Sequence, residues 1–288
     1  MPRAVGIDVG GTKIAAGLVD LESGAVVDRR EKATEAIRGG EAVLQDVISL
    51  AQTVRGDATA IGVGVAELVS REEKIVSNAT IDWLNIPVRE RLSSILPTRV
   101  EADVRAAARA EAKFGGGAGS EIFLFVTVGT GISCCLVTNG QPYLGARGLT
   151  GTFASARGVF PAIDGMLSSS LALEDFSSGP ALGRRVNQPG DARKVIALAG
   201  TGQPLAREVV RSAGFALGSA IAQLVNTLDP ERVVIGGGLG CATGFFYDSV
   251  REAFYKYLWS ELHANVRLTQ AKLGPDAGII GAALASIA

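Results

Sequence analysis

A hairpin signal over residues 5–20 constrains the fold of this chain more than any other stretch. A β-rich, apolar run ends at Asp8, a glycine pair follows at Gly10 and Gly11, and a second β-rich run extends over 14–19. Glycine pairs between two such runs are typical of a tight antiparallel turn. The stretch therefore predicts two neighbouring strands that are joined at the glycines.

The residues of this turn favour an anionic ligand. Glycines let the backbone approach a ligand without a Cβ in the way, and the N–H groups of such a turn form a concavity that binds anions. Thr12 adds a hydroxyl and Lys13 a cation, and Asp8 is placed to hold a hydrated Mg²⁺ beside bound phosphates. The pattern is neither a P-loop nor a dinucleotide fingerprint, because the glycines are adjacent and the following run is β-like. Taken by itself, the stretch also fits an ordinary Gly-Gly hairpin turn.

Two further strand-to-glycine turns occur later in the chain. An apolar run at 126–128 leads into Gly-Thr-Gly, and another at 233–235 leads into three glycines before a helix-like stretch at 244–258. The residues of these turns are Gly129, Thr130, Gly131, Gly236, Gly237 and Gly238. Three such turns in one chain indicate a duplicated nucleotide-binding architecture, in which two halves hold the phosphates.

The three motifs also carry a family resemblance. In their order and spacing, Asp-Val-Gly-Gly-Thr-Lys at 8–13, Gly-Thr-Gly at 129–131 and Gly-Gly-Gly at 236–238 match DxGGTK, GTG and GGG before a helix. The sequence thereby resembles, over essentially its whole length, the ROK family (repressors, open reading frames and sugar kinases) of the actin-like ATPase superfamily. The resemblance implies an α/β fold, with a duplicated, ribonuclease H-like βββαβα unit in two domains around a cleft. It also implies ATP and Mg²⁺ as cofactors, the adenosine near 236–238, and a small-molecule sugar as the substrate.

Apolar periodicity predicts the order of the elements. In the first half we expect three strands within 1–31, further strands at 59–65 and 99–102, and helices at 41–54, 87–96 and 103–114. In the second half we expect strands at 121–128, 132–138, 141–144, 233–235 and 266–271, and helices at 191–199, 204–227, 244–258 and 278–287, whereas 145–190 shows no clear pattern. Together with the resemblance, this order predicts an N-terminal domain of 1–114 plus 275–288 and a C-terminal domain of 115–274. The glycine-rich stretch 115–119 is the expected hinge.

Composition and charge limit the partners. The net charge is −1 and no basic cluster exceeds two residues, so we expect no nucleic-acid binding. Because the hairpin starts at Val5, no room is expected for the DNA-binding domain of the family's repressors. No run of about 18 apolar residues occurs, so no membrane span is expected. Three cysteines cannot build a disulfide framework, which favours a cytoplasmic location. The resemblance implies a homodimer.

Asp103 is the candidate catalytic residue. It lies where the strand at 99–102 meets the helix at 103–114, a place that exposes a side chain at the end of a sheet. Asp is also a preferred helix N-cap, so a purely structural role fits the residue as well. The resemblance implies the catalytic role, because the family's Asn-Asp pair aligns with Ala102 and Asp103. In the family this Asp is the general base that takes the proton from a sugar hydroxyl as its oxygen attacks the γ-phosphate of ATP.

Several positions depart from the family, and all lie on the sugar side. Ala102 replaces the Asn before the catalytic Asp, and Ala66 with Glu67 replaces a Pro-Gly. The family's GExGH falls on 151–155, so that Thr152 and Ser155 replace its Glu and His. The cysteine-rich zinc motif is absent from the comparable region, 166–174, so no structural zinc is expected. The pattern predicts an unusual substrate.

The predicted substrate-binding residues are Glu67, Asn78, Asp82, Thr152 and Ser155. The predicted reaction is ATP-dependent phosphorylation of a hydroxyl, favouring the 6-hydroxyl, of a hexose or amino sugar. The new carboxylate of Glu67 needs a partner if it is enclosed, which an ammonium group on the substrate would supply. Alternatively, Glu67 points into solvent at a loop tip. The main rival function is a catalytically silent sugar- or nucleotide-binding protein. Glu111 is expected to be solvated.

Overall fold

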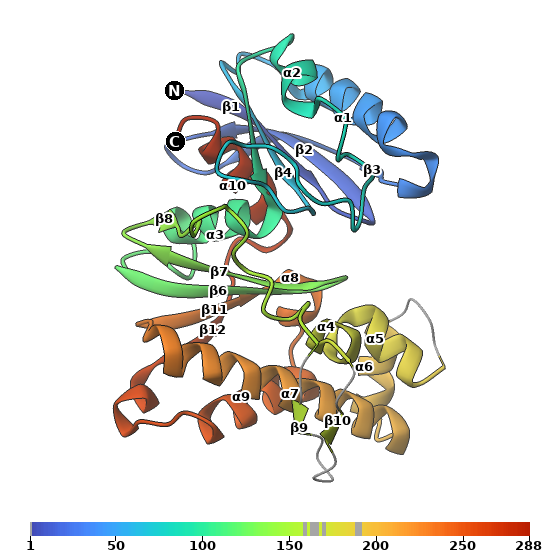
Figure 1. The fold of residues 1–288 in the computed structure, drawn as a ribbon, viewed down its shortest axis with the longest axis vertical. Helices are drawn as coiled ribbons and strands as arrows, with labels where there is room; N and C mark the ends of the chain where they lie inside the picture. The colour runs from blue at the N-terminus through green and yellow to red at the C-terminus, as the bar shows by residue number, and fades with distance from the viewer. Residues whose placement is uncertain (1, 158–159, 162–166, 169–170, 188–191) are drawn as a thin grey trace. The chain divides into compact units, whose positions relative to one another are not determined.

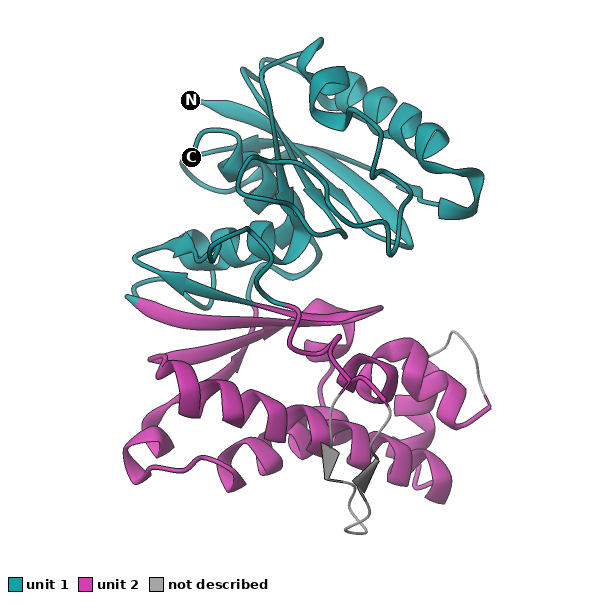
Figure 2. Ribbon diagram, in the orientation of Figure 1, with its two compact units in different colours: residues 1–121, 135–151, 272–288 teal, residues 122–134, 152–271 magenta. Residues whose placement is uncertain are grey.

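The computed structural model describes residues 2–157, 160–161, 167–168, 171–187 and 192–288. Contacts divide the chain into two compact units (Figure 2). Unit 1 comprises Met1–Glu121, Cys135–Gly151 and Lys272–Ala288, and unit 2 comprises Ile122–Cys134 and Thr152–Ala271. Unit 1 is thus discontinuous, and it includes 115–121, 135–151 and 272–274, which the sequence assigns to the second domain.

Unit 1 contains a mixed five-stranded sheet. Its strands are β1 (Arg3–Val9), β2 (Lys13–Asp20), β3 (Val26–Ala33), β4 (Ile61–Val65) and β5 (Thr98–Ala102), in the order β3-β2-β1-β4-β5. The β1–β2 and β2–β3 pairs are antiparallel, whereas β4 runs parallel to β1 and to β5. This is the βββαβ order that the sequence predicts. The remaining elements of the first 121 residues are η1 (Ala36–Arg38), α1 (Gly40–Val54), α2 (Val88–Ser93) and α3 (Asp103–Phe114).

The alternation of residues along β1 assigns its two faces. Val5, Ile7 and Val9 are buried in one cluster with apolar residues of α1. Ala4 belongs to a second cluster with residues of α10 (Ala277–Ala285), which follows the 3-10 helix η3 (Gly274–Asp276). Because strand side chains point alternately to the two faces, Gly6 and Asp8 lie on the α10 side. The sequence of β1 therefore places the carboxylate of Asp8 on the face that α10 covers.

Glycines let α10 approach this face closely. A Cβ on Gly6 would overlap the carbonyl oxygen of Ile279, and one on Gly62 in β4 would overlap that of Ala282. A Cβ on Gly281 of α10 would overlap the carbonyl of Ala106 in α3. Backbone therefore packs directly on backbone, which only glycine permits at these positions. Figure 1 shows α10 beside α3 and the sheet.

Glu111 anchors the points where the chain leaves and re-enters unit 1. Its side chain is fully buried, and its carboxylate accepts hydrogen bonds from the backbone N–H groups of Gly116, Lys272 and Leu273. The interpretation of Glu111 as a solvated residue is therefore wrong. Gly115, Gly116 and Gly117 are buried as well. These contacts are why 115–117 and 272–273 belong to unit 1.

The second five-stranded sheet has the order β12-β11-β6-β7-β8. Its strands are β6 (Ile122–Val128), β7 (Ile132–Thr138), β8 (Gln141–Pro142), β11 (Arg232–Gly236) and β12 (Arg267–Gln270), and the division between the units falls within β7. Strand β11 runs parallel to β6 and to β12. The sequence predicts all five strands, with β8 shorter than expected.

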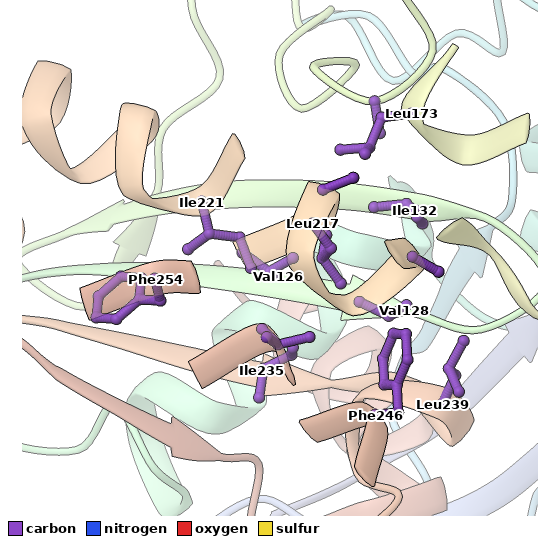
Figure 3. Close-up of a cluster of buried hydrophobic side chains, with 14 of the residues drawn as sticks. Val126, Val128, Ile132, Leu173, Leu217, Ile221, Ile235, Leu239, Phe246 and Phe254 are labelled. Atoms are coloured by element: carbon purple, nitrogen blue, oxygen red, sulfur yellow. The ribbon is translucent and has the colours of Figure 1, made fainter. Parts of the chain in front are cut away.

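Helices cover the part of this sheet that belongs to unit 2. They are α4 (Leu173–Ser177), α5 (Gly179–Arg185), α6 (Ala192–Gly200), α7 (Pro204–Leu228), α8 (Gly237–Gly240) and α9 (Phe245–Lys256), followed by η2 (Glu261–Asn265). The core joins Val126, Ile235 and Leu217 with aromatic residues of α9 (Figure 3). A small two-stranded sheet, β9 (Phe160–Pro161) with β10 (Leu167–Ser168), lies in the stretch without a clear sequence pattern. Among the described residues, no helix is both long and apolar enough to cross a membrane.

Candidate active site

The hairpin between β1 and β2 forms the turn that the sequence predicts. The N–H of Gly10 donates to the carbonyl of Lys13 at 3.0 Å and closes the turn. Thr12 and Lys13 are exposed, and Gly10 and Gly11 are partly so. Lys13 lies 3.7 Å from a carboxylate oxygen of Glu31 on β3, where both side chains are about half exposed. The turn is accessible to a ligand.

Thr34, which the sequence analysis missed, stabilises this turn through two hydrogen bonds to its backbone. It follows β3 and is fully buried. Its hydroxyl donates to the carbonyl of Gly10 at 2.6 Å, and its N–H donates to the carbonyl of Thr12 at 3.0 Å. The signal lies in the strand register, because Lys13 pairs with Ala33, the last residue of β3, and the residue after it therefore lies beside the turn.

Asp8 and Asp103 both lie near the carboxyl ends of parallel strands. Asp8 pairs with Gly64 of β4, which pairs with Glu101 of β5, so that Asp103 follows two residues later at the start of α3. A Cβ on Gly64 would lie 3.6 Å from the Cα of Asp103, which shows how closely the start of α3 approaches β4. Ligands of open α/β sheets bind at such strand ends.

The electrostatics of the two carboxyl groups are unusual. Burial raises the pKa of Asp8 to about 6, and the charge of Lys13 partly offsets this rise. Burial raises the pKa of Asp103 to about 7, helped by the negative charges of Asp8 and Glu67 and opposed by the N–H of Val104. The two acidic groups therefore repel each other, and a cation or a proton would relieve the repulsion.

Asp103 is not the N-cap of α3. Ala102 occupies that position, and Asp103 is the first helical residue. Its carboxylate accepts a hydrogen bond of 2.6 Å from the N–H of Val104. The interpretation of Asp103 as a helix cap is therefore wrong in its strict form, although its charge still suits a helix N-terminus.

The site fits Mg²⁺ only in the coordination that is usual with nucleotides, in which few of the ligands come from the protein. Within the described ranges, no group of three or more His, Cys, Asp or Glu residues is arranged to hold a metal ion. Mg²⁺ is commonly held by one or two carboxylates, several waters and substrate phosphates, without a protein cage. Asp8, with its desolvated carboxylate beside the hairpin turn at 10–13, matches that mode. The 166–174 region of the missing zinc motif lies partly outside the described residues.

Glu67 does not behave as either interpretation from the sequence expects. It is 6% exposed, so it does not point into solvent. Its carboxylate accepts hydrogen bonds from the hydroxyl of Ser77 and from the N–H groups of Ala79, Thr80 and Ile81. Four donors from the chain itself satisfy the carboxylate. The enclosed carboxylate of Glu67 therefore has partners within the chain, and it gives no reason to expect an ammonium group on the substrate.

Asn78 lies within residues 77–81, the segment that is hydrogen-bonded to Glu67, and Asp82 follows directly after this segment. Both side chains are exposed. Next to Asp82, the fully buried Trp83 donates from its indole nitrogen to the carbonyl of Gly40 at 2.7 Å, so Trp83 is a core residue that fixes the segment to α1. In unit 1 the structure thus places Asn78 on an ordered segment, with Asp82 at its far end.

The two glycine turns of unit 2 meet each other. The N–H of Gly129 donates to the carbonyl of Gly131 at 2.9 Å, and a Cβ on Gly129 would lie 3.8 Å from the nitrogen of Gly238. Gly237 has a φ of +81°, and a Cβ there would overlap the carbonyl of Val128. A Cβ on Gly238 would meet open space. Close to Gly129 and Gly238, therefore, a ligand can approach the backbone.

Glu174 on α4 is a second residue that the sequence analysis missed. Its carboxylate accepts the N–H of Ile132 at 2.7 Å and lies 2.8 Å from where a Cβ of Gly131 would be. Its own N–H donates to the carbonyl of Ala154. Ala154 belongs to a turn whose exposed members include Thr152 and Ser155. Unit 2 thus brings both predicted substrate residues near the Gly-Thr-Gly turn.

Known proteins share this fold over nearly the whole chain. A glucokinase of Streptomyces coelicolor is 32% identical over 316 residues, which cover 98% of this chain and 97% of the relative. An N-acetylmannosamine kinase of Escherichia coli is 29% identical, with 96% of each chain covered. The crystal structure of a ROK family glucokinase from Streptomyces griseus, in complex with glucose and AMPPNP, matches with a TM-score of 0.86 at 27% identity and covers 98% of each chain. The model of the ROK family matches residues 4–287, and the chain therefore belongs to the ROK family.

Proposed function

We propose that this chain is a sugar kinase that transfers the γ-phosphate of ATP to a hydroxyl, favouring the 6-hydroxyl, of a hexose or amino sugar. The observation that carries the proposal is the arrangement in unit 1. A phosphate-type hairpin turn at 10–13 is combined with two carboxyl groups, Asp8 and Asp103, at the ends of neighbouring parallel strands. The relatives named glucokinase and N-acetylmannosamine kinase support both substrate classes.

In this proposal Asp103 is the general base. The sugar hydroxyl gives its proton to the carboxylate, its oxygen forms a bond to the γ-phosphorus, and the bond to the ADP oxygen breaks. A pKa raised to about 7 keeps the carboxylate a good proton acceptor near neutral pH. Mg²⁺ supplies charge neutralisation at the phosphates, and Asp8 is the residue we infer to hold it through water. The hairpin amide of Gly11, whose peptide is held by the hydroxyl of Thr34, binds a phosphate oxygen.

In unit 2, we assign the nucleotide to the Gly-Thr-Gly and Gly-Gly-Gly turns. The backbone of Gly129–Gly131 faces the phosphates, and Gly236–Gly238 face the adenosine. The open space at the Cα of Gly238 supports this assignment, because a ligand can reach the backbone there. Glu174 keeps the Gly-Thr-Gly turn in shape through the N–H of Ile132.

A catalytically silent binding protein is the alternative. The replacements at Ala102, Thr152 and Ser155 favour it, since they remove side chains that relatives use toward the sugar. The retained Asp103 and the three glycine turns favour the kinase. We further propose a homodimer, which the family resemblance supports, and a cytoplasmic location, which the low number of cysteines in the sequence favours.

The deciding experiment measures ADP release with Mg²⁺-ATP against a panel of hexoses and amino sugars that includes glucose, glucosamine and N-acetylmannosamine. We expect sugar-dependent ADP release and a phosphorylated sugar in the product mixture. ATP binding without phosphorylation of any sugar in the panel would favour the silent protein and count against the kinase.

A further inference from the structure

A buried carboxylate organises the segment beside the phosphate hairpin. Glu67 lies two residues after the end of β4 and is almost completely buried. Three of its four hydrogen-bond donors are N–H groups of consecutive residues, Ala79 at 3.0 Å, Thr80 at 2.6 Å and Ile81 at 2.7 Å. Successive N–H groups that converge in this way form an anion-binding concavity. In this chain the anion is the chain's own side chain.

Other hydrogen bonds also hold the loop of residues 66–81, among them one from the N–H of Val76 to the carbonyl of Leu68. The N–H of Leu68 donates to the hydroxyl of Ser77, which itself donates to Glu67. Farther out, Val69 and Ile75 form an isolated antiparallel bridge. The two ends of the loop from 66 to 81 are thus hydrogen-bonded to each other. The carboxylate of Glu67 at one end accepts the N–H groups of residues 79–81 at the other end. No N–H of 79–81 is free to reach a substrate while it is bonded to Glu67.

The segment that Glu67 holds reaches the phosphate hairpin. The methyl carbon of Thr80 lies 2.8 Å from where a Cβ of Gly11 would be, so Thr80 packs directly on the hairpin glycine. The side chains of Asn78 and Thr80 are exposed on this segment. Their positions relative to the hairpin therefore depend on the hydrogen bonds that Glu67 accepts.

We propose that Glu67 is a positioning residue, which fixes residues 77–81 beside the hairpin turn and thereby sets how the acceptor sugar is held. The proposal rests on the proposed kinase function for its effect on the acceptor, but the ordering of the segment is independent of that function. Glu67 does not contact the reacting atoms, and it acts through Asn78 and Thr80. This positioning role replaces the suggestion from the sequence that the carboxylate of Glu67 binds an ammonium group of the substrate.

Glu67→Gln tests the proposal. Glutamine keeps the size of the side chain but turns one acceptor oxygen into an amide donor that faces N–H groups. Glu72→Gln is the matched control, because Glu72 belongs to the same loop, is exposed, and accepts a hydrogen bond from the hydroxyl of Ser70. Ser77→Ala removes one of the four donors and serves as a milder second variant.

Two readouts are measured on the full chain. Amide hydrogen exchange at 79–81, without substrates, should accelerate by about tenfold or more in Glu67→Gln, since hydrogen bonds to a charged acceptor are lost. The KM for glucose, or for the panel sugar with the highest turnover, should rise by a similar factor while the KM for ATP stays within about twofold. Ser77→Ala should shift both readouts in the same direction but less, and Glu72→Gln should match the wild type.

The outcomes separate this inference from the kinase proposal. Unchanged exchange at 79–81 in Glu67→Gln, or an equal rise of both KM values, overturns the inference even when the wild type is an active kinase. If the wild type phosphorylates no sugar, the kinase proposal fails, and accelerated exchange still supports the ordering role of Glu67. If Glu67→Gln does not fold, Ser77→Ala decides by the same two readouts.

Discussion

The hydroxyl of Thr34 donates a hydrogen bond of 2.6 Å to the carbonyl oxygen of Gly10, although the two residues lie 24 positions apart. Thr34 has no exposed surface, so it acts on a ligand only through the shape of the turn. The bond orients the peptide between Gly10 and Gly11, whose N–H belongs to Gly11. The geometry of the 10–13 turn is thus fixed by a buried residue that a ligand of the turn would not touch.

Thr34→Val is therefore expected to weaken ATP use without destroying the fold. Valine has the same shape but leaves the Gly10 carbonyl without this donor, so the KM for ATP should rise by about two- to tenfold. Thr34→Ser should retain most of the affinity. Thr53→Val on α1, which removes a hydroxyl bonded to Ser49, is the control. Steady-state kinetics at varied ATP test this, and equal KM values for Thr34→Val and the wild type would contradict it.

Asp103→Asn should lower turnover by about 10²–10⁴-fold, the range of a positioned general base. Asparagine keeps the size of the side chain and can still accept the N–H of Val104, so ATP affinity should change little. Asp248→Asn, at an exposed position in the first turn of α9, is the matched control. Turnover is measured by ADP release and ATP affinity by calorimetry. Retained turnover in Asp103→Asn would leave the residue with a structural role only.

The same substitution should stabilise the ligand-free protein in a pH-dependent way. In the unfolded chain the carboxyl of Asp103 has an ordinary pKa near 3.8, whereas in the folded chain it is about 7. Between these values the folded state binds more protons, so stability falls as pH rises through this window and then levels off. Asp103→Asn removes this loss. Its melting temperature should exceed that of the wild type at pH 8, and the difference should shrink toward pH 4; a constant difference would argue against the raised pKa.

Gly238→Val is the cleanest test of the nucleotide site in unit 2. A side chain there meets open space in the protein and intrudes only where the nucleotide is proposed, so ATP affinity should fall by about tenfold or more while the melting temperature stays close to that of the wild type. Gly131 is a poorer choice, because its Cβ would press on Glu174. Gly200→Val, also in open space, is the control. Unchanged ATP affinity in folded Gly238→Val would remove the third turn from the site.

Metal removal should separate catalysis from folding. EDTA is expected to abolish ADP release, and added Mg²⁺ to restore it, because the phosphates of ATP need a divalent cation to neutralise their charge. The melting temperature of the ligand-free protein should not change with EDTA, since the sequence has no zinc-binding cysteine cluster near 166–174. Stoichiometric zinc in chelator-washed protein, or a lower melting temperature with EDTA, would show a structural metal.

Local patterns in the sequence predict much of the fold. The glycine turns mark the hairpin at 10–13 and the strand ends at 129 and 236, and helix α3 begins and ends where its alanine-rich pattern predicts. Helix α8 was not predicted, because Gly237–Gly240 consists largely of glycine and is helical only in its tertiary setting.

The burial of charged residues was harder to predict. The sequence predicts a solvated Glu111 and leaves Glu67 either in a substrate pocket or in solvent, yet each is buried because backbone N–H groups converge on it. Those donors lie 12 to 14 residues away for Glu67 and more than 160 for Lys272 and Leu273. No short-range pattern records such contacts. Thr34 and Glu174 were missed for the same reason, since each acts on a turn that is distant in sequence.

The packing of α10 onto Gly6 and Gly62 has a consequence for synthesis on the ribosome. Strands β1 and β4 emerge before residues 122–271 of the chain, and α10 emerges after them. The sheet face that α10 covers, including Ala4 and Gly6, therefore stays open to solvent while unit 2 is being made. We expect unit 1 to complete its folding after unit 2, in contrast to the usual order in which N-terminal domains fold first. A nascent chain stalled near residue 271 would present this uncovered, glycine-rich face to chaperones.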